Sequence, residues 1–278
     1  MKKFLILFSF LFVGMVFANT LTKNLSYSLS DASRFDTLSV EFINGKGVVK
    51  GTKENSVKVK VKVNIKSDDD SACQEVYDKL KLNVKTSGDE IDLSLNYDDL
   101  KKYLNSEISF FNLFCSHRKK VEMSVDVEIF IPSRFSIEFS GVNFDIKAEG
   151  LKKVKISSVN GAIGAKNIGK VECESVNGNI VLKDIIYKVE CEVVNGNLTL
   201  ETNSEKLSSV SFESVNGNTK IRVPFNVIGD VETDSLTSKA TLVLKGKKIV
   251  GKNLEWQGDG NCDIDVETVN GKIFIEGF

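Results

Sequence analysis

The sequence is poor in the residues that build most catalytic and metal sites. Its 278 residues include one histidine, one tryptophan, two prolines and five cysteines. A single histidine excludes metal sites built from several imidazoles and leaves His117 as the one imidazole base. No C-x-x-C pair occurs, which excludes a zinc ribbon and a thioredoxin-like redox motif. The scarcity of proline leaves nearly every backbone N–H able to pair in a β-sheet.

An excess of charge of one sign is also missing. The 37 Lys and Arg residues balance 38 Asp and Glu residues, and hydrophobic residues make up 41% of the chain. This composition is typical of a globular protein rather than a disordered chain. Balanced charge provides no electrostatic reason to expect DNA or RNA, so we predict no nucleic-acid partner.

Long apolar runs are absent after the first twenty residues. Two lysines precede the apolar stretch at 4–17, and the small residue Ala18 follows it. The stretch is shorter than the roughly 20 residues that span a bilayer comfortably. The sequence therefore predicts a signal peptide at 1–18 and an exported protein in the periplasm, at the cell surface or outside the cell. We expect no transmembrane segment in the mature chain; an uncleaved membrane anchor is the alternative.

Most segments after about residue 38 alternate apolar and polar residues with a period of two, which indicates strands with one buried face. Lysines occupy the polar positions of 57–66, and mainly acidic residues those of 121–129. The two rows either face each other across neighbouring strands or are simply solvated.

The alternation also suggests how the chain is divided. After the signal peptide we expect N-terminal β-strands at 19–66, an insertion at 67–120 and repeats at 121–278, with 19–278 forming one continuous domain. Within the insertion we expect a short helix ending near Leu80, then a hairpin, then a loop.

The last part of the chain is a repeat. Val-Asn-Gly recurs at intervals of 17, 18, 21 and 54 residues, with degenerate copies at 142–144 and 236–238. The corners are Asn160-Gly161, Asn177-Gly178, Asn195-Gly196, Asn216-Gly217 and Asn270-Gly271. Mostly apolar residues stand six and four positions before each Asn, and three and five after it. Each copy therefore contributes one inward-facing strand, a corner and a second inward-facing strand.

Two all-β architectures satisfy this pattern. Asn-Gly between alternating strands is a strong hairpin signal, so a meander of Asn-Gly hairpins is one. The other is a parallel β-solenoid, or β-helix, with coils of about 17–21 residues. We favour the solenoid because whole copies align column by column. The expected fold is this solenoid with an N-terminal antiparallel β region that carries an α-containing insertion.

Three features together resemble a known family. They are the alternating strands that lead to Ile131-Pro132, the segment at 135–143, and the tandem copies of the type at 174–180, Glu-Ser-Val-Asn-Gly-Asn-Ile. This pattern resembles the bacterial putative-adhesin domain family of unknown function, over about residues 35–278. The resemblance implies an exported or membrane-attached β-solenoid without catalytic residues. The insertion and the broken last coils depart from the family pattern.

Carboxylates stand three and five positions before the repeat corners. In stacked coils they would form two outward ladders with neighbours about 4.8 Å apart. They are Glu172, Glu174, Glu190, Glu192, Glu213, Glu232, Asp234, Asp265 and Glu267. A solvated polar face is the simplest interpretation. The sharper hypothesis is a strip that binds calcium or a polycationic surface, with all but Glu232 and Asp265 as candidate metal ligands.

The cysteines suggest two pairs. Cys173 and Cys191 occupy the same inward column one coil apart, close enough for a disulfide, although we favour two free buried thiols. Cys73 and Cys115 flank the insertion, where a disulfide would pin the segment between them. Cys262 is left over.

No motif points to catalysis. Cys115 lies two residues from His117, but adjacency in sequence is not a catalytic triad. The aromatic run at 110–114 is a core strand, a cap over the end of the solenoid or an exposed partner-binding patch. We therefore expect no enzyme and no bound cofactor, but an exported adhesin or cell-envelope protein that binds a protein or glycan surface ligand. The alternative is a polysaccharide-active β-helix enzyme, or a calcium- or glycan-binding module that uses the carboxylates.

Overall fold

The computed structural model describes residues 20–104 and 121–278. The expected signal peptide at 1–18, Cys115, His117 and the aromatic run at 110–114 lie outside the described residues. Among those that are described, no helix is long and apolar enough to cross a membrane.

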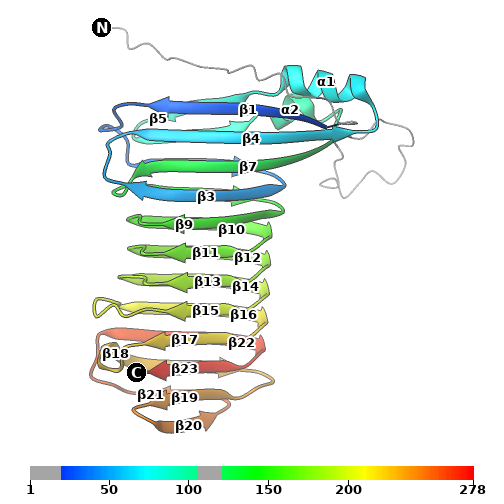
Figure 1. Ribbon diagram of the computed structural model, residues 1–278. Coiled ribbons are helices and arrows are strands. Elements are labelled where there is room, and N and C mark those ends of the chain that lie inside the picture. Colours follow the sequence, from blue (N-terminus) through cyan, green and yellow to red (C-terminus); the bar gives the residue numbers. More distant parts are fainter. Residues whose placement is uncertain (1–19, 105–120) are drawn as a thin grey trace.

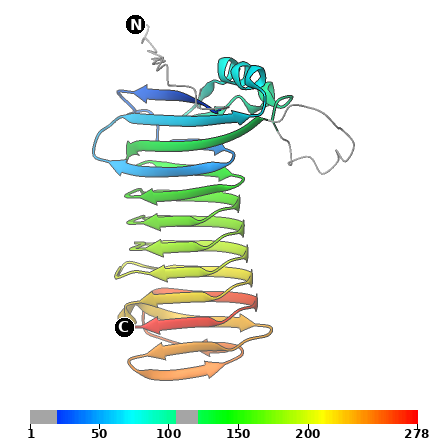
Figure 2. The ribbon, with the colours of Figure 1, turned by 45° about the vertical axis from the view of Figure 1, so that its right-hand side comes forward.

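The strands of the described residues form two long sheets that stack into one column (Figures 1 and 2). Sheet A runs, in spatial order, β1 (Thr20–Leu29), β4 (Val57–Ser67), β7 (Val121–Pro132), β3 (Gly45–Thr52), β9 (Phe144–Glu149), β11 (Ile163–Lys166), β13 (Ile180–Lys183), β15 (Leu198–Glu201), β17 (Thr219–Val223), β23 (Ile273–Gly277), β19 (Ala240–Leu244) and β20 (Lys247–Gly251). Sheet B runs β21 (Leu254–Trp256), β18 (Ile228–Ser235), β22 (Cys262–Asn270), β16 (Ser209–Asn216), β14 (Lys188–Asn195), β12 (Lys170–Asn177), β10 (Lys153–Asn160), β8 (Ser136–Gly141), β2 (Thr37–Phe42), β6 (Glu90–Leu95) and β5 (Leu82–Ser87). The all-β prediction is confirmed.

Each repeat copy places one strand in each sheet. The strands before the corners pair in parallel in sheet B, where Asn160 lies opposite Asn177 and Asn177 opposite Asn195. The strands after the corners pair in parallel in sheet A. The two strands that flank a corner belong to different sheets, so the alternative of Asn-Gly hairpins is wrong. The sheets are mixed rather than wholly parallel, because antiparallel pairs join β1 to β4 and β19 to β20. They are also open, ending at β1 and β20 and at β5 and β21.

The order of strands in space departs from the order in sequence at both ends of the repeats. The N-terminal region is only partly antiparallel, because β2 and β3 pair in parallel with β8 and β9. Asn44-Gly45 forms the corner between β2 and β3, an additional copy that the sequence analysis did not recognise. The last copy also moves out of sequence order. Its strands β22 and β23 insert between the fourth copy and the degenerate copy at 236–238.

The core lies between the sheets, as the alternation predicts. The inward column that begins at Val154, Val171 and Val189 is at most 1% exposed. Three aromatic rings fill the wider part of the core, with centroids 5.0 Å apart for Phe139 and Phe144 and 6.1 Å for Phe42 and Phe144. Such alternation makes one continuous apolar interior, which is the main stabilising term of the fold.

The insertion contains the expected helix and hairpin. Helix α1 (Asp70–Lys79) begins at Asp69, whose side chain accepts a hydrogen bond from the Ala72 N–H at 3.1 Å. It packs on β1 and β4 at one end of the column (Figure 1). Strands β5 and β6 form an antiparallel hairpin, followed by the short helix α2 (Tyr97–Leu100). A 3₁₀ turn, η1 (Phe225–Val227), precedes β18.

Candidate functional site

Sheet B carries two contrasting rows of side chains on its outer face. The residue just before each corner and the residue two positions earlier face the same side, because a strand alternates with period two. We call the first set the valine row: Ile43, Val142, Val159, Val176, Val194, Val215, Val269 and Leu236. In the second set, five consecutive strands carry acidic residues, which we call the carboxylate row: Glu174, Glu192, Glu213, Glu267 and Asp234. Beyond this row the same column holds Ser157, Ser140 and, on β2, Glu41. Five of the valines are 38–41% exposed, and Leu236 is 64% exposed.

These rows line a groove of about 730 Å³. It crosses eight consecutive strands, β2, β8, β10, β12, β14, β16, β22 and β18. Seven strand spacings of about 4.8 Å make the groove about 34 Å long. The strands stack into a column (Figure 1), so a groove that crosses them follows the axis of that column.

Strand register places the carboxylates in one unbroken line. Glu174 lies opposite Glu192 and Glu192 opposite Glu213, and the line continues through Glu267 to Asp234. The expected ladder is thus formed at this position. The ladder one step farther from the corners is broken by Ser211, which lies between Glu190 and Asp265.

The two ladders differ in their counter-charges. In the broken ladder, Lys153 Nζ lies 2.7 Å from Glu172 Oε1, and Lys188 Nζ lies 2.7 Å from Glu190 Oε1. Within residues 20–104 and 121–278, no member of the carboxylate row forms an ion pair. The row therefore presents uncompensated negative charge to the groove.

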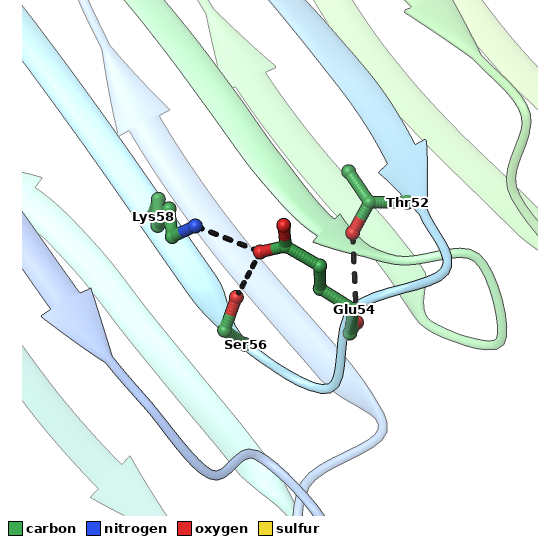
Figure 3. Close-up of polar contacts among 4 residues, drawn as sticks. All are labelled: Thr52, Glu54, Ser56 and Lys58. Atoms are coloured by element: carbon green, nitrogen blue, oxygen red, sulfur yellow. Dashed lines mark hydrogen bonds and ion pairs between the residues drawn. The ribbon is translucent and has the colours of Figure 1, made fainter.

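The pKa of Glu213 reflects this arrangement. Partial burial raises the pKa above its ordinary value of 4.5, and the charges of Glu192, Glu267 and Asp265 raise it further. Glu54, in the turn between β3 and β4, shows the opposite case. It accepts hydrogen bonds from Lys58 Nζ at 2.7 Å and Ser56 Oγ at 3.1 Å, and these bonds lower its pKa (Figure 3).

The corners are held by an amide ladder that runs beside the valine row. Each corner asparagine donates from Nδ2 to the Oδ1 of the asparagine one copy earlier. The distances are 2.8 Å from Asn177 to Asn160, 3.0 Å from Asn195 to Asn177 and 2.9 Å from Asn216 to Asn195. The ladder continues from Asn270 at one end to Asn44 at the other. The sequence pattern predicts the corners, and the recurrence of Asn rather than Asp at each corner was the one signal of this unpredicted ladder.

The corner glycines are required by close stacking. A Cβ on Gly178 would lie 1.9 Å from the carbonyl oxygen of Gly161, and a Cβ on Gly196 would lie 1.9 Å from that of Gly178. Every other amino acid would collide there with the backbone of the neighbouring copy. Glycine at the corners thus allows successive copies to stack closely.

The structure also places the described cysteines. Cys173 lies opposite Cys191, and both thiols are buried and free, as favoured from the sequence. Burial raises the pKa of the Cys191 thiol, which disfavours its thiolate form. Cys73 lies on α1 and is buried. Its disulfide with Cys115 stays a prediction, because Cys115 lies outside the described residues.

The carboxylates do not converge on a point. No three metal-ligating side chains gather within the described part of the chain at a spacing that could hold a metal ion. The members of the carboxylate row lie instead in line on one face. Calcium takes six to eight oxygen ligands around it, a geometry that differs from a line.

The sequence matches no protein-family model and no curated protein. Eleven solved chains match in structure. A putative cell adhesion protein from Clostridium sporogenes is 12% identical with a TM-score of 0.42, over 93% of this chain and 100% of that one. A putative adhesin from Bacteroides fragilis is 11% identical with a TM-score of 0.43, over 91% and 97%. A putative lipid binding protein from Parabacteroides distasonis is 14% identical with a TM-score of 0.39, over 94% and 97%. TM-scores below 0.5 at such identities carry no argument about function or family.

Proposed function

We propose that this protein is a non-catalytic interaction protein of the cell envelope or cell surface, and that the groove of sheet B binds a cationic ligand. The observation that carries the proposal is the carboxylate row, five negative charges without counter-ions beside an exposed apolar row. Like charges about 4.8 Å apart repel each other, so the row costs free energy until a cation binds.

The fold itself does not require carboxylates at these positions. Ser157 and Ser140 occupy the same column on β10 and β8, where the strands pair in the same register. A neutral polar side chain therefore fits equally well on the outer face. The acidic residues on five consecutive strands are better explained by a ligand than by folding.

The same arrangement favours binding over catalysis. Acid and base catalysis by carboxylates needs two groups in different environments, so that one is protonated while the other is ionised. Neighbouring members of the carboxylate row share one type of environment, repeated along the column. We therefore propose binding by the row rather than glycoside hydrolysis, and organic cations rather than calcium as its ligands.

We further propose that the repeats form a two-sheet parallel β-solenoid, finished at each end by antiparallel strands. Parallel pairing in register between successive copies supports this description. Export through the signal peptide expected at 1–18, and membership of the adhesin family that the sequence resembles, belong to the same proposal.

The test is binding of oligolysine to the purified full chain. The variant E192Q/E213Q/E267Q should lose at least 10-fold in affinity, because it removes three adjacent charges. The matched control E172Q/E190Q changes two carboxylates that already have lysine partners, and it should bind nearly as the wild type does. The proposal would be overturned if both variants lost affinity for oligolysine equally, or if neither variant lost affinity.

Two further measurements test the class of function. Protease treatment of intact cells should cleave the protein if it is exposed at the cell surface. Polysaccharide turnover that E213Q abolishes would show an enzyme and contradict the proposal.

A further inference from the structure

We propose that the partner of the groove is a basic amphipathic α-helix that lies along the column axis. This inference rests on the proposed function and names the class of ligand for the same groove. It follows from the length of the valine row, from the position of the charges and from the spacing of the strands.

The valine row offers an apolar strip for one face of a helix. It is continuous over all eight strands of the groove, from Ile43 next to β2 to Leu236 next to β18. At 1.5 Å per residue, a groove about 34 Å long accommodates a helix of about 22 residues. Helices that bind in grooves use apolar side chains at positions i, i+3, i+4 and i+7, which form such a strip.

The carboxylate row defines which side of the helix is basic. It flanks the valine row on five strands, from Glu174 on β12 to Asp234 on β18. Toward the other end the same column holds Ser157, Ser140 and finally Glu41 on β2. A complementary helix therefore carries lysine or arginine along one flank over about 13 of its residues, then neutral polar residues opposite the two serines and one further basic residue opposite Glu41.

The spacing of the carboxylates fits the repeat of a helix better than the repeat of an extended peptide. Carboxylates repeat every 4.8 Å or so along the column, while a helix turns every 5.4 Å or so. Over four spacings the mismatch reaches about 2.4 Å, which the flexible stems of lysine and arginine can absorb. Side chains on one face of a strand repeat at about 6.7 Å, so the mismatch over the same distance reaches about 7.6 Å. An extended basic peptide thus loses register with the row after two or three contacts.

The experiment compares three 22-residue peptides made from the same leucine, lysine and glutamine residues. One has leucine at helical spacing and lysine along one flank, the second alternates leucine and lysine as a strand does, and the third has a random order. Affinities for the full chain are measured by calorimetry, and peptide helicity by circular dichroism. We expect the helical pattern to bind at least 10-fold more tightly than the other two and to gain helicity on binding.

Substitutions in both rows complete the test. V176T/V194T/V215T keeps the shape and strand preference of valine but replaces one methyl group of each side chain by a hydroxyl. The affinity for the helical peptide should fall about 10-fold. V181T is the matched control, since Val181 is equally exposed but lies on sheet A. E192Q/E213Q should also lower the affinity for this peptide, and E172Q/E190Q should leave it unchanged. Melting temperatures establish that each variant is folded.

The outcomes separate the two proposals. If the strand pattern, the random peptide or a chitosan oligomer binds as tightly as the helical pattern, the helix proposal is overturned while the cationic groove stands. If no cationic probe binds, both proposals fail. If V181T weakens binding as much as V176T/V194T/V215T does, the valine row is not the contact surface and the helix proposal fails.

Discussion

The outer faces of the two sheets are built alike but charged differently. Each bears a hollow of similar volume, about 730 Å³ on sheet B and about 760 Å³ on sheet A. On sheet A the register places Lys60 opposite Glu128 and Lys62 opposite Asp126, and Lys46 Nζ lies 3.7 Å from Asp126 Oδ1. Charges of opposite sign alternate there, whereas sheet B aligns charges of one sign.

The repeat section shows the same contrast. On sheet A, Arg222 lies between Glu201 and Glu276, with nitrogen to oxygen distances of 2.8 and 2.7 Å. On sheet B, Glu213 lies between Glu192 and Glu267. In-register stacking magnifies whichever pattern the sequence carries, because each side chain has a neighbour on both sides at about 4.8 Å. The charges around Arg222 on sheet A are thus paired within the sheet, whereas the carboxylate row of sheet B has no ion-pair partner among the described residues.

The largest expected effect comes from the corner that both sheets share. Gly196→Ala should destabilise the protein by about 3 kcal/mol, because the new Cβ collides with the Gly178 carbonyl oxygen. Denaturant unfolding measures this change. Gly164→Ala is the control, since the nearest atom to its Cβ would be Lys147 Cγ at 3.6 Å. Equal stability of the two variants would contradict the close stacking of the corners.

The next largest effect is expected from a substitution that removes the charge alternation of sheet A. Arg222→Ala leaves Glu201 and Glu276 without their common partner, so sheet A gains the like-charge problem of sheet B. We expect the melting temperature to fall by roughly 2–4 °C at low salt and by less at high salt. Arg222→Lys should restore part of the loss. A fall that does not depend on salt would mean that packing, rather than charge, stabilises this row.

On sheet B, a substitution that removes a like charge should stabilise the folded protein. Glu213→Gln removes repulsion with Glu192 and Glu267, and we expect a gain of about 0.5 kcal/mol at pH 7. Glu172→Gln should not stabilise, because it removes the partner of Lys153. Thermal unfolding at low ionic strength measures both. A loss of stability in Glu213→Gln would show that the row is already compensated.

The smallest expected effect is the pH dependence of that gain. The pKa of Glu213 is raised in the folded state, so folding favours its protonated form. Its favourable contribution is complete below the unfolded pKa of about 4.5 and is lost as the pH rises through the higher folded pKa. The stability difference between Glu213→Gln and the wild type should therefore grow from pH 4 to pH 7. A difference that is constant over this range would contradict the raised pKa.

Local pattern was enough to predict much of the fold. The recurrence of Val-Asn-Gly predicted the corners, and the alternation around Val154 and Val171 predicted the buried columns. Both signals are periodic along the sequence, so they can be recognised without knowing which strands pair in space. Pairing order is not periodic, and for this reason the corner at Asn44-Gly45 was missed and the insertion of the last copy, at Asn270, between two earlier copies was not predicted. Their neighbours lie far away in the sequence, and a different chain path would satisfy the same local pattern.

In the candidate site, too, some features follow from the sequence and others only from the tertiary structure. The sequence by itself determined which residues face outward before each corner, because backbone alternation depends only on position along a strand. Only the tertiary structure decided that Lys153 neutralises Glu172 while Glu192, Glu213 and Glu267 stay without counter-ions. Charge compensation depends on distances between strands, and these distances are set by how the copies stack into the column.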